Sequence, residues 1–186
     1  MALLAESLVD EWLNRNGFFT MRGLKHGVHE IDLLGVRPSG DSFEAWHVEV
    51  QASFRPIGYI CPLIKDYVPD FAKSRTSAKA RPKKIISPCV KAWVEKKYKS
   101  SAKVKARNSI WPNLQWQFFL VHGIVREPAE LAIMQKLGVT TIPLHEVLGE
   151  LEHMPGKITG GAGTDLAELI EYYKENTGQE SVAGEI

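Results

Sequence analysis

The sequence predicts an α/β protein in which a mixed β-sheet is flanked by helices, in the order α-β-β-β-α-β-α-β-α. Three observations lead to this prediction. Apolar residues recur at helical spacing at the start of the chain, and they alternate with polar residues in the segments that follow. A strand–helix–strand run in the second half implies a parallel pair of strands joined by a right-handed crossover.

The first part of the chain supplies one helix and three strands. Apolar spacing predicts a helix over residues 3–16, which Gly17 ends. Strands are expected over 18–24, 28–36 and 44–51. The third strand alternates between two faces, which carry Trp46, Val48 and Val50 on one side and His47, Glu49 and Gln51 on the other.

The second part alternates helices with strands. Ser87 and Pro88 are the residue types of a helix N-cap and first helical position, and an apolar stripe follows them. Residues 75–84, just before, are expected to be a mobile loop. The later elements are expected to be a buried strand over 114–125, a helix from Glu127-Pro128 to Gly138, a strand over 139–144 and a short helix over 145–151.

Length and composition indicate one compact domain. The 186 residues, 44% apolar and 24% charged, fit a domain over 1–153 followed by an appendage over 154–186, made of a linker, an amphipathic helix and a disordered tail. The chain lacks an apolar run of the roughly 18–20 residues that cross a bilayer, and its start lacks signal-peptide features. Cys61 and Cys89 fit no disulfide framework. We expect a reduced, cytoplasmic location and no membrane partner.

The charges are segregated along the chain. Residues 73–107, the basic segment, carry thirteen Lys and Arg against the single Glu95, whereas the parts before and after are net acidic. This balance predicts contact with the backbone phosphates of DNA more than a merely solvated surface. The lysines expected to make these contacts are Lys83, Lys84, Lys91, Lys96, Lys97, Lys99, Lys103 and Lys105.

Two carboxylates meet in the predicted hairpin of segments 28–36 and 44–51. If paired residue numbers sum to 81 across the turn, Asp32 lies opposite Glu49, and Glu30 lies opposite Gln51. Like charges placed opposite each other repel, so a hard divalent cation such as Mg²⁺ would stabilise the pair. The alternative is that these acids are simply solvated on an exposed face of the hairpin.

The same residues resemble the PD-(D/E)XK nuclease superfamily, which has the restriction-endonuclease-like fold and includes Holliday-junction resolvases. H-E-I-D-L-L at 29–34 is similar to the G-E-I-D-L-I of bacterial members, and V-E-V-Q at 48–51 is similar to their V-E-V-K. Glu6 matches an acid in the first helix of many relatives. The resemblance covers residues 1–55 and beyond them rests on element order.

The resemblance implies a site for Mg²⁺ or Mn²⁺ made by Asp32, Glu49 and the backbone carbonyl of Val50, with Glu6 supporting it. In the family, the metal activates a water that attacks a phosphodiester. Gln51 replaces the usual lysine. Its amide could position that water, but it can neither act as a base nor offset negative charge.

A cation from elsewhere, Lys25 or Lys65, is an alternative source of the missing positive charge. Glu30 and His47, on the same face as Glu49, are secondary candidates for the site. Three histidines near this face lack a cysteine ligand, which disfavours zinc. Gly160 to Gly163 lacks the ending of a phosphate-binding loop, so no nucleotide cofactor is expected.

The sequence thus favours a metal-dependent deoxyribonuclease, a phosphodiester hydrolase, with a homodimer as one possible assembly. It leaves open whether DNA is cut internally or from an end, and whether the process is repair, recombination, restriction or phage biology. Two alternatives stay open. One is a DNA-binding module that has lost activity with the lysine, and the other is a protein-interaction subunit. The sequence leaves the form of the DNA substrate open.

Overall fold

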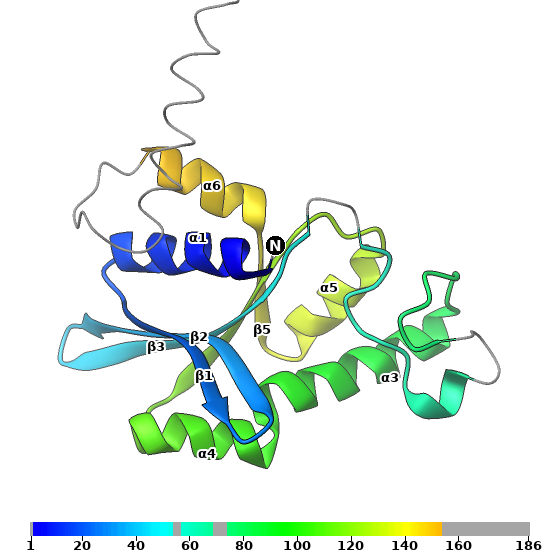
Figure 1. Cartoon of the computed structure of the whole chain (residues 1–186), viewed down its shortest axis with the longest axis horizontal. Coiled ribbons are helices and arrows are strands. Elements are labelled where there is room, and N and C mark those ends of the chain that lie inside the picture. The colour runs from blue at the N-terminus through cyan, green and yellow to red at the C-terminus, as the bar shows by residue number, and fades with distance from the viewer. Residues whose placement is uncertain (1, 54–56, 69–73, 154–186) are drawn as a thin grey trace, which may run out of the picture.

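The computed structural model describes residues 2–53, 57–68 and 74–153 and consists of a mixed five-stranded sheet between layers of helices (Figure 1). The elements are α1 (Ala2–Arg15), β1 (Phe19–His26), β2 (His29–Ser39), β3 (Ser42–Gln51), η1 (Lys65–Tyr67), α3 (Lys83–Val94), η2 (Glu95–Lys99), α4 (Ser101–Ile110), β4 (Trp116–His122), α5 (Pro128–Lys136), β5 (Val139–Pro143) and α6 (Leu144–His153). The predicted order is confirmed, with α3, η2 and α4 forming its second helical unit. The predicted linker, C-terminal helix and tail lie outside the described residues.

The sheet has the strand order β1-β2-β3-β4-β5, with antiparallel pairing among the first three strands and parallel pairing from β3 to β5. The predicted hairpin register is confirmed, because Ser39 pairs with Ser42 and Leu33 with Val48. The turn between β2 and β3 contains two residues, and Gly40 in it has a φ of 59°, a left-handed conformation that glycine adopts without strain.

Helices cover both faces of the sheet. α1 and α6 pack on the face that carries Val48 and Val50, and α3, η2 and α5 pack on the other. The alternative that the acids are solvated on an exposed face is therefore wrong for Glu49, which is 1% exposed, and His47 on the same face is 0% exposed. Cationic side chains from η2 and α4 reach these residues and make their burial possible.

The helix predicted to begin at Ser87 and Pro88 begins earlier, at Lys83, and Pro88 lies inside it. Ile85 and Ile86 in the added turn are buried in the same apolar cluster as the rest of α3. Their burial outweighs the single backbone hydrogen bond that a proline in a helix cannot donate. The predicted mobile loop is correspondingly shorter, and buried Arg81 holds its end in place.

The remaining predictions of elements agree with the structure within a few residues. α1, α5, β5 and α6 lie where the sequence placed them, and the Glu127 carboxylate caps α5 by accepting from the backbone N–H of Ala129. In the part of the chain that the structure describes, each helix is too short or too polar to cross a membrane.

Candidate active site

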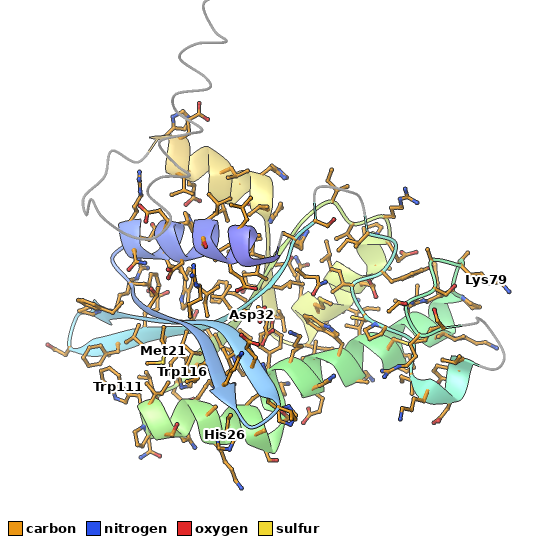
Figure 2. All side chains as sticks on the ribbon, viewed as in Figure 1. Met21, His26, Asp32, Lys79, Trp111 and Trp116 are labelled. Atoms are coloured by element: carbon orange, nitrogen blue, oxygen red, sulfur yellow. The ribbon has the colours of Figure 1, made fainter. Side chains whose placement is uncertain are left out.

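Asp32 and Glu49 approach each other from adjacent strands. The ladder between β2 and β3 runs only as far as Leu33 and Val48. Next to that last pair, the Asp32 carboxylate bonds to the other strand: its Oδ2 accepts from the backbone N–H of Val50 at 2.8 Å. This bond ties the Asp32 side chain to β3 beside Glu49, near the middle of the molecule (Figure 2).

Positive side chains surround Glu49. Its Oε2 lies 2.5 Å from Nζ of Lys97, and its Oε1 lies 2.8 Å from Nζ of Lys103. Oε1 also accepts from Nε2 of His47 at 3.0 Å. Lys25 and Lys65, the alternative sources of positive charge named from the sequence, are not among the described ion-pair partners of Glu49, and Lys97 and Lys103 supply the charge in their place.

Arg107 fixes the tautomer of His47. Nη1 of Arg107 lies 2.8 Å from Nδ1 of His47, and a guanidinium can only donate. Nδ1 therefore accepts, so Nε2 carries the hydrogen and donates it to Glu49. Burial lowers the pKa of His47 to about 4, which keeps the ring neutral near pH 7. The same Nη1 also donates to the carbonyl of Tyr98 at 2.8 Å.

The two acids differ in protonation. Burial and then the charge of Glu49 raise the pKa of Asp32 to about 7. Burial would also raise the pKa of Glu49, but the hydrogen bond from His47 and the charge of Lys97 outweigh it and lower that pKa to about 2. Asp32 is thus the less well neutralised acid of the pair.

Lys97 remains protonated in this site. Burial would lower its pKa, but the charges of Glu49 and Asp32 raise it above the ordinary lysine value. The charge of Glu6, on α1, adds to this effect, which places Glu6 within electrostatic reach of Lys97. Lys97 can therefore supply positive charge, but it is not suited to take a proton from water.

The other predicted site residues lie at the margin. Gln51 is exposed at the end of β3 and lines a cavity together with Lys97. The Glu30 side chain is exposed, and its backbone carbonyl accepts from Lys103. His47, the other secondary candidate, does not lie at the margin: it is buried under α4, where it contacts Arg107.

The basic segment divides into surface and site lysines. Of the eight lysines predicted to contact phosphates, six are exposed and remain available: Lys83, Lys84, Lys91, Lys96, Lys99 and Lys105. The prediction of phosphate contact is wrong for Lys103. Its side chain is 4% exposed and donates hydrogen bonds to the Glu49 carboxylate and to the Glu30 carbonyl. Lys97 is half-buried against Glu49.

Sequence reasoning missed Arg107 and the role of Lys103. Both lie on α4, four residues apart, so they share one helix face with Ala106, which is also buried. That spacing was the available signal, but hydropathy assigns two cations to the solvent side of a helix. η2 carries Lys97 in a π-helical turn, a rare conformation that is frequent at functional sites.

The oxygen atoms around Asp32 and Glu49 meet some, but not all, of the requirements of a site for a hard divalent cation. Mg²⁺ is commonly held by one or two carboxylates together with water and phosphate oxygens, so Asp32, Glu49 and the Val50 carbonyl are a suitable set. The raised pKa of Asp32 means that its charged form is disfavoured in the protein alone, and an added cation would stabilise that form. Among the described residues, however, no group of three or more Asp, Glu, His or Cys side chains is arranged to hold a metal ion, and Lys97 occupies one oxygen of Glu49.

Comparisons with known proteins give little further information. No protein-family model and no curated protein matches the chain. Among solved structures it is similar to the crystal structure of a protein of unknown function, AF1548, with 11% sequence identity and a TM-score of 0.44. The match covers 81% of this chain and 66% of that protein, so the chain spans just under two thirds of its length.

Proposed function

We propose that the chain is a metal-dependent DNA nuclease. The observation that carries the proposal is the adjacency of Asp32 and Glu49 on neighbouring strands, with the cation Lys97 bound to Glu49. Paired carboxylates with one cation are suited to phosphodiester hydrolysis, in which negative charge develops on the phosphoryl oxygens. The motif resemblance around both acids supports the same function.

Asp32, Glu49 and the Val50 carbonyl would hold Mg²⁺ or Mn²⁺. When bound, such an ion polarises the phosphodiester and lowers the pKa of a coordinated water. Lys97 takes the place of the lysine that position 51 lacks and offsets charge on the phosphate. For this, Lys97 must release Oε2 of Glu49. Gln51 orients the attacking water through its amide.

The exposed lysines of the basic segment bind the DNA backbone. Lys91 and Lys96 lie on α3 and η2, the helical unit that also carries Lys97 to the acids. Phosphates held along this unit would therefore follow a path toward Glu49. Contacts of this kind carry no base information, so we expect cleavage without sequence specificity.

A cleavage assay tests the proposal. Plasmid, single-stranded and branched DNA are incubated with Mg²⁺ or Mn²⁺, and we expect cleavage that EDTA stops and that Asp32→Asn removes. Asp41→Asn, which changes an exposed acid in the β2–β3 turn, is the matched control and should cut normally. Equal cleavage by the Asp32→Asn variant and the parent would show that the site is wrongly assigned.

A DNA-binding module without nuclease activity is the second candidate. The observation favouring it is that both oxygens of Glu49 already accept from protein cations, so the fold needs no metal to neutralise this acid. It predicts salt-dependent DNA binding, no cleavage with either metal and no Mn²⁺ binding by the protein alone.

A further inference from the structure

A cavity of about 240 Å³ lies beside the candidate site, between α3 and the segment that follows β3. Gln51 and Lys97 both line it, so it adjoins the contact between Lys97 and Glu49. It is smaller than the roughly 300–1,000 Å³ of most ligand pockets, which suits one small group and excludes a DNA duplex.

The lining of the cavity combines apolar surface with positive charge. Its apolar and aromatic members include Ile60, Pro62 and Trp93. Among the described lining residues, every charged one is a cation: Arg75, Lys96 and Lys97. An occupant that is flat and largely apolar at one end and anionic at the other matches this lining, and a nucleotide has that composition.

Hydrogen bonds hold the wall opposite α3 in place. The Glu130 carboxylate accepts from the backbone N–H groups of Ile60 at 2.6 Å and Cys61 at 3.1 Å. Nη1 of Arg81 donates to the carbonyl of Cys61 at 2.6 Å, and the Arg81 guanidinium lies 3.8 Å from the ring centre of Tyr59. The wall is therefore preformed, which lowers the cost of ordering it around a ligand.

We propose that this cavity takes the base and sugar of one unpaired nucleotide whose phosphate lies at Lys97 and Gln51. The substrate class is then DNA with unpaired nucleotides, such as a single strand or a flap, because a base inside a duplex would first have to leave the stack. This inference rests on the proposed function for the place of the scissile phosphate. Its test requires no cleavage.

Binding is measured by fluorescence anisotropy in EDTA, with a short single strand and the blunt duplex of the same sequence. We expect the parent to prefer the single strand by about tenfold, the effect of one base contact. Ala92→Trp fills the cavity from an exposed position of α3 and should abolish the preference. Ala132→Trp, on an exposed position of α5 outside the cavity, is the matched control and should retain it.

Pro62→Trp fills the cavity from the opposite wall, so the test does not depend on one variant folding. A preference that survives both fillings, or a parent that binds duplex as tightly as single strand, would overturn the inference. If the proposed function alone is wrong, DNA remains uncut with every metal. The parent then still prefers the single strand, and the variants that fill the cavity still lose that preference. Duplex cleavage without that preference would contradict the cavity assignment alone.

Discussion

Nζ of Lys97 lies 2.5 Å from Oε2 of Glu49, although the two residues are 48 positions apart in the sequence. The positive charge beside this acid therefore comes from a helical unit packed over the sheet and not from position 51 of the same strand. The geometry changes the expectation for Gln51, because the charge of the lysine that the motif lacks is supplied by another residue.

Lys97→Met is expected to reduce cleavage about a hundredfold or more, because it removes the charge that offsets the developing negative phosphate. Gln51→Lys alone should change the rate little, since Lys97 is already in place. The double variant should recover part of the activity from its new lysine. Initial rates with Mg²⁺ on single-stranded DNA give all three results, and a Lys97→Met variant as fast as the parent would contradict the role of Lys97.

The two acids should differ in their effect on stability. Glu49→Gln leaves Lys103 and Lys97 without their counter-charge in a largely buried site, so the free energy of unfolding should fall by about 3–5 kcal/mol. Asp32→Asn should cost less than about 1 kcal/mol, because the raised pKa of Asp32 shows that its charged form is already disfavoured. Urea unfolding at pH 7 measures both values. Equal losses would mean that the charges around Glu49 are solvated.

The hairpin could be predicted from the sequence, whereas the partners of Glu49 could not. The register of β2 on β3 is fixed by two local features. One is the two-residue turn at Gly40 and Asp41, and the other is the alternation of apolar and polar residues along each strand. Lys103 lies 54 positions from Glu49, and its place depends on how α4 packs over the sheet. In the sequence it is one cation among thirteen in the basic segment, with nothing local that distinguishes a buried lysine from a solvated one.

The predicted start of α3 was wrong for a related reason. Ser87 and Pro88 have the local chemistry of a helix start, yet α3 begins at Lys83 because burial of Ile85 and Ile86 is a tertiary effect. Local capping preferences are worth about 1 kcal/mol, and burying one isoleucine side chain contributes about 1.5–3 kcal/mol. Where the two disagree, the packing decides.

Stability should depend on pH through His47. The pKa of this ring falls from 6.5 to about 4 on folding, so the unfolded chain binds a proton that the folded one refuses. The contribution of His47 to the free energy of unfolding is complete above pH 6.5 and is lost as the pH falls toward 4. The slope reaches about 1.4 kcal/mol per pH unit. Glu49, Arg107 and Lys103 are the charged groups that face the ring, and they oppose one another in setting this pKa.

His47→Gln provides the matched comparison, because glutamine does not titrate and the other ionisable groups are shared by both proteins. Unfolding free energies measured in urea and EDTA at pH 5, 6 and 7 should fall more steeply toward acid in the parent than in the variant. Parallel curves would show that His47 is charged, or solvated, in the folded protein.

DNA affinity should depend on salt through the exposed lysines. Lys96→Gln is expected to lower the slope of log affinity against log salt by about 0.7 on a single strand, the loss of one neutralised phosphate. Lys136→Gln, on an exposed position of α5, removes the same charge away from the basic segment and should leave the slope unchanged. Equal slopes for Lys96→Gln and the parent would remove Lys96 from the interface.

Metal binding in the absence of DNA separates the nuclease from the inactive module. Because Nζ of Lys97 occupies Oε2 of Glu49, a divalent cation must compete with a positive charge for this oxygen. Lys97→Met should therefore bind Mn²⁺ at least about tenfold more tightly than the parent, even though it cleaves DNA more slowly. Repulsion between a unit charge and a divalent ion about 4 Å apart is about 2 kcal/mol in water, and a tenfold change corresponds to about 1.4 kcal/mol.

Calorimetric titration of Mn²⁺ into metal-free protein measures this effect. Lys91→Met removes an exposed lysine of α3 and should bind as the parent does, and Asp32→Asn should bind weakly or not at all because it removes one of the two carboxylate ligands. Tighter binding confined to Lys97→Met would place the metal and Lys97 at the same carboxylate. If the parent and Lys97→Met both fail to bind Mn²⁺, Asp32 and Glu49 hold no metal, and the basic segment would then serve DNA binding alone.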